Sequence, residues 1–170
     1  MRLARRAVFL DRDGTINRPP DAGDHLRAAY EVELLAGAAT AVAMFARAGY
    51  LCVVVSNQPV GETTDEDLAA VDARLRDLVA AGGAELNATY YCTHGPDDGC
   101  DCRKPEPGLL LRAARELEID LSASWTVGDS QTDVEAGARA GCRTLRVRPV
   151  DGALLAAAQT ILAEDERKAA

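Results

Sequence analysis

Carboxylates of the kind that handle phosphate and metal ions stand at two places in the chain. Asp11 and Asp13 belong to the run DRDGT, which follows an apolar stretch at residues 7–10, and Asp129 follows Gly128 much later. Alternate residues of an extended chain face the same way, so Asp11 and Asp13 can address one site. Two carboxylates there repel each other unless a cation lies between them. Hard oxygen ligands of this kind suit Mg²⁺.

A metal-bound carboxylate pair also suits phosphoryl transfer. One aspartate can attack phosphorus while the other protonates the leaving oxygen and then activates water, a role for which we expect a raised pKa. The positive counterpart would come from Lys104 and from the hydroxyl and backbone amides at Ser56 and Asn57. These groups can hold the oxygens of the transferring phosphoryl group.

A second set of residues has the composition of a metal site, with two short pairs in the patterns C-x-H and C-x-C. They are Cys92, His94, Cys100 and Cys102. Three thiolates and one imidazole are a usual set for tetrahedral structural Zn²⁺, and four protein ligands leave no position for a catalytic water. The alternative is reduced, buried thiols, which describes Cys52 and Cys142 better because they lie in apolar surroundings. We therefore expect a structural zinc loop at residues 92–102.

These side chains must be positioned by elements that bring distant parts of the chain together. Apolar runs predict strands at residues 7–10, 51–55, 88–91, 124–127 and 144–147. Helical spacing predicts helices at residues 36–48, 64–81, 107–117 and 132–140, and a last helix capped by Asp151 that frays in the charged tail 164–168. This alternation predicts an α/β fold, a Rossmann-like parallel sheet with helices on both faces. Ligands of such sheets bind beyond the carboxyl ends of the strands, where the residues above fall.

Length and charge restrict the classes of protein further. The chain has 170 residues, the size of one domain, and we expect a single domain at residues 1–170. Its net charge of −8 opposes binding to nucleic acid. The basic and then apolar start is too short for a signal peptide, and no stretch reaches membrane-spanning length. We expect a cytoplasmic protein, by default a monomer, with no nucleic-acid or membrane partner.

The segments VFLDRDGT, SNQ, RKP and VGDSQTD resemble the four motifs of the haloacid dehalogenase (HAD) superfamily of phosphatases, over about residues 7–148. The resemblance implies that Asp11 is the nucleophile and Asp13 the general acid and base. It also implies that Mg²⁺ is bound by Asp11, the backbone carbonyl of Asp13, and Asp129. Ser56 and Lys104 would then bind the phosphoryl group. Asp133 would anchor the site, or be an ordinary first-turn helix residue.

The segment YYCTHGPDDGCDCRKPEPGLLL resembles the zinc-containing, histidinol-phosphatase-like subfamily. Within it, RKPEPGLL favours members that remove the C7 phosphate of D-glycero-D-manno-heptose 1,7-bisphosphate, a sugar bisphosphate. The resemblance implies that Arg103, beside the lysine, helps to hold the substrate. One departure is the loop Pro59–Thr63, which lacks the arginine usual there.

Other functions remain open on the sequence. Histidinol phosphate or another small phosphomonoester is the alternative substrate, and a nucleic-acid 3′-phosphatase or an inactive binding module would be a different class. Arg18, His25 and Arg27 lie in the segment expected to overhang the site, either gripping the substrate or forming a solvated loop. No long insertion separates the first motif from Ser56, so no large cap domain is expected.

Overall fold

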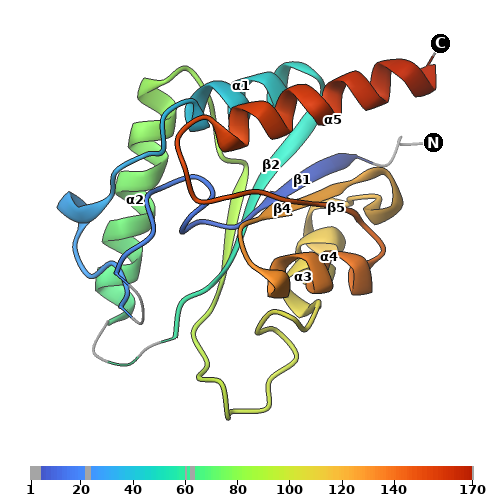
Figure 1. Ribbon diagram of the computed structural model, residues 1–170. Helices are drawn as coiled ribbons and strands as arrows, with labels where there is room; N and C mark the ends of the chain where they lie inside the picture. Colours follow the sequence, from blue (N-terminus) through green and yellow to red (C-terminus); the bar gives the residue numbers. More distant parts are fainter. Residues whose placement is uncertain (1–4, 22–23, 60, 62–63, 170) are drawn as a thin grey trace.

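Five parallel strands form one sheet in the order β3-β2-β1-β4-β5. The computed structural model describes residues 5–21, 24–59, 61 and 64–169. The strands are β1 (Arg6–Leu10), β2 (Tyr50–Asn57), β3 (Ala88–Cys92), β4 (Trp125–Gly128) and β5 (Arg143–Arg146). Figure 1 shows the sheet running through the middle of the molecule. Among the described residues, no helix is both long enough and apolar enough to cross a membrane.

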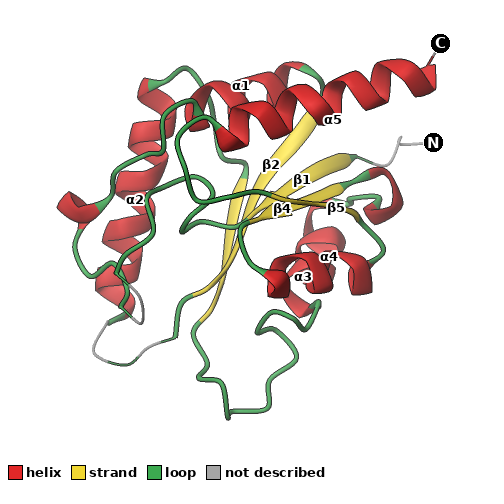
Figure 2. Cartoon of the chain, viewed as in Figure 1, coloured by secondary structure: helices red, strands yellow, loops and turns green. Residues whose placement is uncertain are grey.

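Helices cover both faces of this sheet. They are α1 (Ala38–Arg47), α2 (Asp65–Ala81), α3 (Gly108–Leu117), α4 (Gln131–Ala140) and α5 (Ala153–Ala169), with short 3-10 turns η1 (Ala29–Glu31) and η2 (Leu121–Ala123). Helices α1, α2 and α5 pack on one face, and α3 and α4 pack on the other (Figure 2). The α/β architecture expected from the sequence is confirmed. Between β1 and β2 the described residues form only loops, η1 and α1, so no large cap covers the sheet edge.

The central strand β1 is apolar on both sides. Val8 and Leu10 point toward the layer of α1, α2 and α5, whereas Ala7 and Phe9 point toward α3 and α4. All four side chains are completely buried. Burial on both faces is what distinguishes a strand inside a parallel sheet from the alternating pattern of a half-exposed strand. The short apolar run of the sequence therefore places Asp11 at the centre of the sheet edge.

Strand β2 is longer than its apolar run. It continues through Ser56 and Asn57, because these residues pair in register with Tyr91 and Cys92 of β3. The polar pair thus belongs to the strand rather than to the loop after it.

At the start of α2, Thr64 and Asp67 form the predicted capping box, in which each side chain accepts a hydrogen bond from the other's backbone amide.

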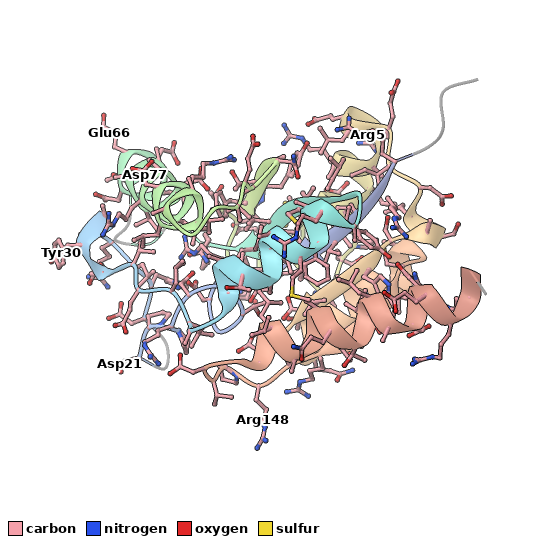
Figure 3. All side chains as sticks on the ribbon, turned by 90° about the horizontal axis from the view of Figure 1, so that it is seen from above. Arg5, Asp21, Tyr30, Glu66, Asp77 and Arg148 are labelled. Carbon is pink, nitrogen blue, oxygen red and sulfur yellow. The ribbon has the colours of Figure 1, made fainter. Side chains whose placement is uncertain are left out.

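Two expectations about the last helix, its cap and its fraying end, are wrong. Asp151 does not cap it, because α5 begins at Ala153 and the Asp151 carboxylate instead accepts hydrogen bonds from the Ala36 amide, at 2.8 Å, and from Arg18. The charged tail does not fray either. The helix continues to Ala169, and Figure 3 shows α5 lying beside α1 and extending past its end. Asp165 fastens this end through an ion pair with Arg6 at 3.0 Å.

Candidate active site

Three neighbouring strands bring the candidate residues to one edge of the sheet. β1 lies between β2 and β4, and all three run in the same direction. Their carboxyl ends therefore place Asp11, the Ser56–Asn57 pair and Asp129 side by side. A cavity of about 260 Å³ lies at this edge and is lined by all of them, together with Asp13, Lys104 and Asp133.

Lys104 contributes a positive charge to this cavity. Its side chain is buried, and Nζ donates to Asp11 Oδ1 and to the Val55 carbonyl oxygen, both at 2.8 Å, and to Asp133 Oδ1. Burial by itself lowers the pKa of the ammonium, but the charges of Asp11 and Asp133 outweigh it and raise the pKa. The lysine is therefore charged and holds the two carboxylates together.

Three carboxylates crowd one point. Oxygens of Asp11, Asp129 and Asp133 all lie within 4.8 Å of one another. Burial raises the pKa of Asp11 to about 6, although Lys104 opposes this shift. Burial and the charge of Asp133 also raise the pKa of Asp129. A divalent cation with oxygen ligands would relieve this repulsion, so the donor set fits Mg²⁺.

Gly14 keeps the space beside Asp129 free. A Cβ atom at position 14 would lie 2.3 Å from Asp129 Oδ2, and the glycine has a φ of +77°. Both the backbone conformation and the close approach require glycine. The glycine of the DRDGT run thus serves the carboxylate of a different strand.

Asp13 also lines the cavity, but its carboxylate is held by four hydrogen bonds. Arg12 donates from Nε and Nη2, both at 3.0 Å, Asn17 donates at 2.9 Å and Gln58 at 2.7 Å. Burial would raise the pKa of Asp13, but the Arg12 charge and these hydrogen bonds outweigh it and lower the pKa. The expectation of a raised pKa at the acid and base is therefore wrong for this arrangement.

Sequence reasoning missed the three donors around Asp13. Arg12, Asn17 and Gln58 are all buried, although their types are usually exposed. Their signal was their position inside DRDGTIN and SNQ, where polar residues adjoin buried strands. The Gln58 amide that donates to Asp13 also donates to Ser56 Oγ at 3.1 Å, so the Ser56 hydroxyl and the Asp13 carboxylate share this donor. The Asn57 side chain, by contrast, bonds to the main chain of Lys104.

The predicted metal loop lies between β3 and α3, where it extends away from the sheet (Figure 1). One ligand atom from each of four residues lies within 4.8 Å of the others; they are Cys92, His94, Cys100 and Cys102. The Cys92 and Cys100 sulfurs are 3.7 Å apart, and His94 Nδ1 is 3.2 Å from the Cys102 sulfur. This cluster could hold a metal ion.

A second, larger cavity of about 830 Å³ adjoins this metal loop. It shares Asn57, Lys104 and Thr132 with the smaller cavity, so the two cavities meet beside Lys104. Arg103 lines the larger cavity, and its Nη1 donates to the His94 carbonyl oxygen at 3.1 Å. The metal loop and the arginine beside the buried lysine are thus directly connected.

Of the three residues in the segment expected to overhang the site, one lines the small cavity and two do not. His25 lines the small cavity. Arg18 instead pairs with Glu33 and Asp151, and Arg27 pairs with Asp24. Within the divergent loop Pro59–Thr63, residues 60, 62 and 63 lie outside the part of the chain that the structure describes.

Known proteins resemble this chain over most of its length. A family model described as HAD-hydrolase-like matches residues 101–164. A D-glycero-beta-D-manno-heptose-1,7-bisphosphate 7-phosphatase of Pseudomonas aeruginosa is 40% identical, over 88% of this chain and 85% of the relative. A D-glycero-alpha-D-manno-heptose-1,7-bisphosphate 7-phosphatase of Burkholderia mallei is 34% identical, over 97% and 92%. The crystal structure of a D,D-heptose 1,7-bisphosphate phosphatase from B. bronchiseptica, complexed with magnesium and phosphate, matches with a TM-score of 0.84 and 32% identity, covering 94% of this chain and 99% of that one.

Proposed function

This chain belongs to the HAD-like hydrolase family, and from that premise we propose that it is a Mg²⁺-dependent phosphatase that removes the C7 phosphate of D-glycero-D-manno-heptose 1,7-bisphosphate. The observation that carries the proposal is the packing of Asp11, Asp129 and Asp133 within 4.8 Å of one another at the end of the sheet. The buried Lys104 supplies the positive charge that a phosphoryl group needs there.

Asp11 is the nucleophile in this proposal. One of its oxygens attacks phosphorus, the bond from phosphorus to the sugar oxygen breaks, and an aspartyl phosphate forms. The departing sugar oxygen takes a proton from Asp13, which carries a proton at this stage and is left as a carboxylate. Asp13 then removes a proton from a water molecule, whose oxygen attacks the same phosphorus. The bond to Asp11 breaks, and inorganic phosphate leaves.

The partners of Asp13 favour the second half of this sequence. Hydrogen bonds from Arg12, Asn17 and Gln58 stabilise the carboxylate form, which is the form that accepts a proton from water. Lys104 and Ser56 bind the oxygens of the phosphoryl group, and Asn57 keeps Lys104 in place.

Mg²⁺ would be held by Asp11, by Asp129 and by the backbone carbonyl of Asp13, and would offset the negative charge of the transferring phosphoryl group. Asp133 accepts a hydrogen bond from the Ser130 amide at 3.0 Å and another from Lys104. It therefore joins the start of α4 to the phosphate site and acts as an anchor.

The two cavities indicate how a bisphosphate would lie. The lining of the small cavity includes Asp21 and Asp24, which would repel a second phosphate. The larger cavity opens beside Lys104 and carries Arg103. We infer that the phosphate that is not cleaved lies on the Arg103 side, with the sugar between the two cavities.

The Cys92, His94, Cys100 and Cys102 cluster would hold a structural Zn²⁺, because its donor set and spacing suit tetrahedral zinc. We also propose that the protein is a cytoplasmic monomer with one domain at residues 1–170, which acts on a small phosphorylated metabolite and binds neither nucleic acid nor membrane.

Phosphate release from heptose 1,7-bisphosphate and from histidinol phosphate, each with Mg²⁺, tests the proposal. We expect fast release from the bisphosphate and none with Asp11→Asn, which controls for a contaminating phosphatase. Preferential hydrolysis of histidinol phosphate would move the substrate to the alternative that Asp21 and Asp24 favour, since these carboxylates attract a cationic group. If neither substrate is hydrolysed, the better interpretation is that the chain is an inactive binding module.

A further inference from the structure

Arg12, between the two proposed catalytic aspartates, is a buried charge. Its side chain is completely shielded from solvent, and its guanidinium binds both oxygens of the adjacent Asp13. The Nε atom is 3.0 Å from Oδ1 and an Nη2 atom is 3.0 Å from Oδ2. This parallel pair of hydrogen bonds fixes the rotation of the carboxylate as well as its distance.

The stability of the fold does not explain this ion pair. Arg12 and Asp13 are neighbours in the chain, so their contact joins no two elements of the structure. Removing both charges from water carries a desolvation cost that a buried pair often fails to recover, and an apolar side chain of similar size avoids it. In addition, Arg12 Nη1 has no hydrogen-bond partner among the described residues. The pair therefore calls for a functional reason.

The Arg12 guanidinium is also connected to side chains of β3 and α2. Its guanidinium carbon lies 5.7 Å from the centre of the Tyr91 ring on β3. The Tyr91 hydroxyl donates to Asp72 Oδ1 of α2 at 2.6 Å, and Asp72 Oδ2 accepts from Arg76 at 2.9 Å. A continuous set of contacts thus runs from α2 through β3 to the carboxylate of Asp13.

We propose that Arg12 is a positioning residue that fixes the Asp13 carboxylate for proton transfer to the leaving sugar oxygen and from the attacking water. This inference rests on the proposed phosphatase function. All four acceptor positions of Asp13 are filled by Arg12, Asn17 and Gln58. The leaving oxygen must therefore displace one donor, and a neutral amide gives way more easily than the charge-assisted pair. Gln58 can leave because its amide also bonds to Ser56.

The test compares substrates that differ in their need for a proton. A sugar alkoxide leaves poorly without one, whereas the nitrophenolate of p-nitrophenyl phosphate leaves unaided. Arg12→Lys keeps the charge but loses the planar fork. We expect it to lower kcat/KM for the sugar bisphosphate at least about tenfold more than for the aryl phosphate, because general acid catalysis contributes on the order of 10²–10⁴. Asp13→Asn sets the benchmark for this pattern.

The surface offers a matched control. Arg112 has the same two kinds of contact, with Nε 2.8 Å from Glu116 Oε1 and its guanidinium carbon 5.6 Å from the Tyr90 ring. It lies outside both cavities at the site, so Arg112→Lys should leave both kcat/KM values unchanged. If Arg12→Lys does not fold, Tyr91→Phe carries the same test, with Tyr90→Phe as its control, and a smaller loss in the same direction is expected.

Equal losses of kcat/KM on the two substrates, or no loss, would overturn the role of Arg12 while leaving the phosphatase itself intact. A selective loss in Asp13→Asn without one in Arg12→Lys would have the same meaning. If the unmodified protein hydrolyses neither substrate, the proposed function fails and the inference fails with it.

Discussion

The side-chain amide of Asn57 and the main chain of Lys104 form a reciprocal pair of hydrogen bonds. Asn57 Nδ2 donates to the Lys104 carbonyl oxygen at 3.0 Å, and the Lys104 amide donates to Asn57 Oδ1 at 2.9 Å. The last residue of β2 thus binds a loop residue as a neighbouring strand would. Through it, the sheet sets the position of the lysine that contacts Asp11.

Asn57→Ala is expected to reduce kcat/KM at least about tenfold and to lower the free energy of unfolding by about 2 kcal/mol, at roughly 1 kcal/mol for each hydrogen bond. Steady-state kinetics and urea unfolding measure the two effects. Asn87→Ala is the matched control, since Asn87 Oδ1 accepts from the Cys52 amide at 2.7 Å near the other end of β2. It should lose stability and keep its activity; a comparable loss of activity there would contradict a specific role for Asn57.

Gly14→Ala should impair Mg²⁺-dependent turnover by about 10–100-fold, the usual effect of disturbing the surroundings of a metal ligand. The reason is the contact of 2.3 Å that a Cβ would make with Asp129 Oδ2. Gly49→Ala separates this contact from backbone strain, because Gly49 has a φ of +85° but open space around it. Mg²⁺ titrations of activity on both variants give the answer. If Gly14→Ala and Gly49→Ala have equal activities, the space beside Asp129 is unimportant for turnover.

Loss of metal from the cysteine and histidine cluster should damage both stability and activity. Arg103 contacts the His94 carbonyl oxygen at 3.1 Å and directly precedes Lys104, so a disordered loop would displace both residues. We expect Cys100→Ser to lower the zinc content measured by mass spectrometry, the melting temperature by at least about 5 °C and kcat/KM. Cys142→Ser should keep the metal. Zinc-free protein that remains folded with unchanged turnover would exclude this coupling.

Asp165 gives the stability of the protein a pH dependence. Burial by itself raises its pKa, but hydrogen bonds from Tyr50 and Arg143 and the charge of Arg6 outweigh this and lower it. A lowered folded-state pKa means that the stabilisation is complete above the unfolded value of about 3.9 and is lost as the pH falls below it.

Asp165→Asn should therefore reduce the free energy of unfolding by about 1.5–3 kcal/mol at neutral pH, the range of hydrogen bonds to charged groups. The difference from the unmodified protein should narrow below about pH 4. Urea unfolding at several pH values measures it. A gap that stays constant with pH would show that the carboxylate charge contributes nothing.

The sequence by itself determined the succession of strands and helices along the chain and the edge of the sheet at which the polar residues gather. The apolar run before Asp11 and the helical repeat from Ala38 onward are local patterns. When strands and helices alternate along the chain in this way, the usual fold is a parallel sheet covered by helices on both faces. The C-x-H and C-x-C pairs are also local, and their four ligand atoms do meet. Short-range chemistry was enough for these features.

Only the tertiary structure decided which partners each charge has. Arg12 in the sequence is one more charged residue, and its burial against Tyr91 depends on β1 and β3 flanking β2. The sequence predicts a cap at Asp151 and a fraying tail around Asp165, because their partners, Ala36 and Arg6, are more than a hundred residues away. Such contacts leave no periodic trace, since they arise only when the strand order brings remote segments together.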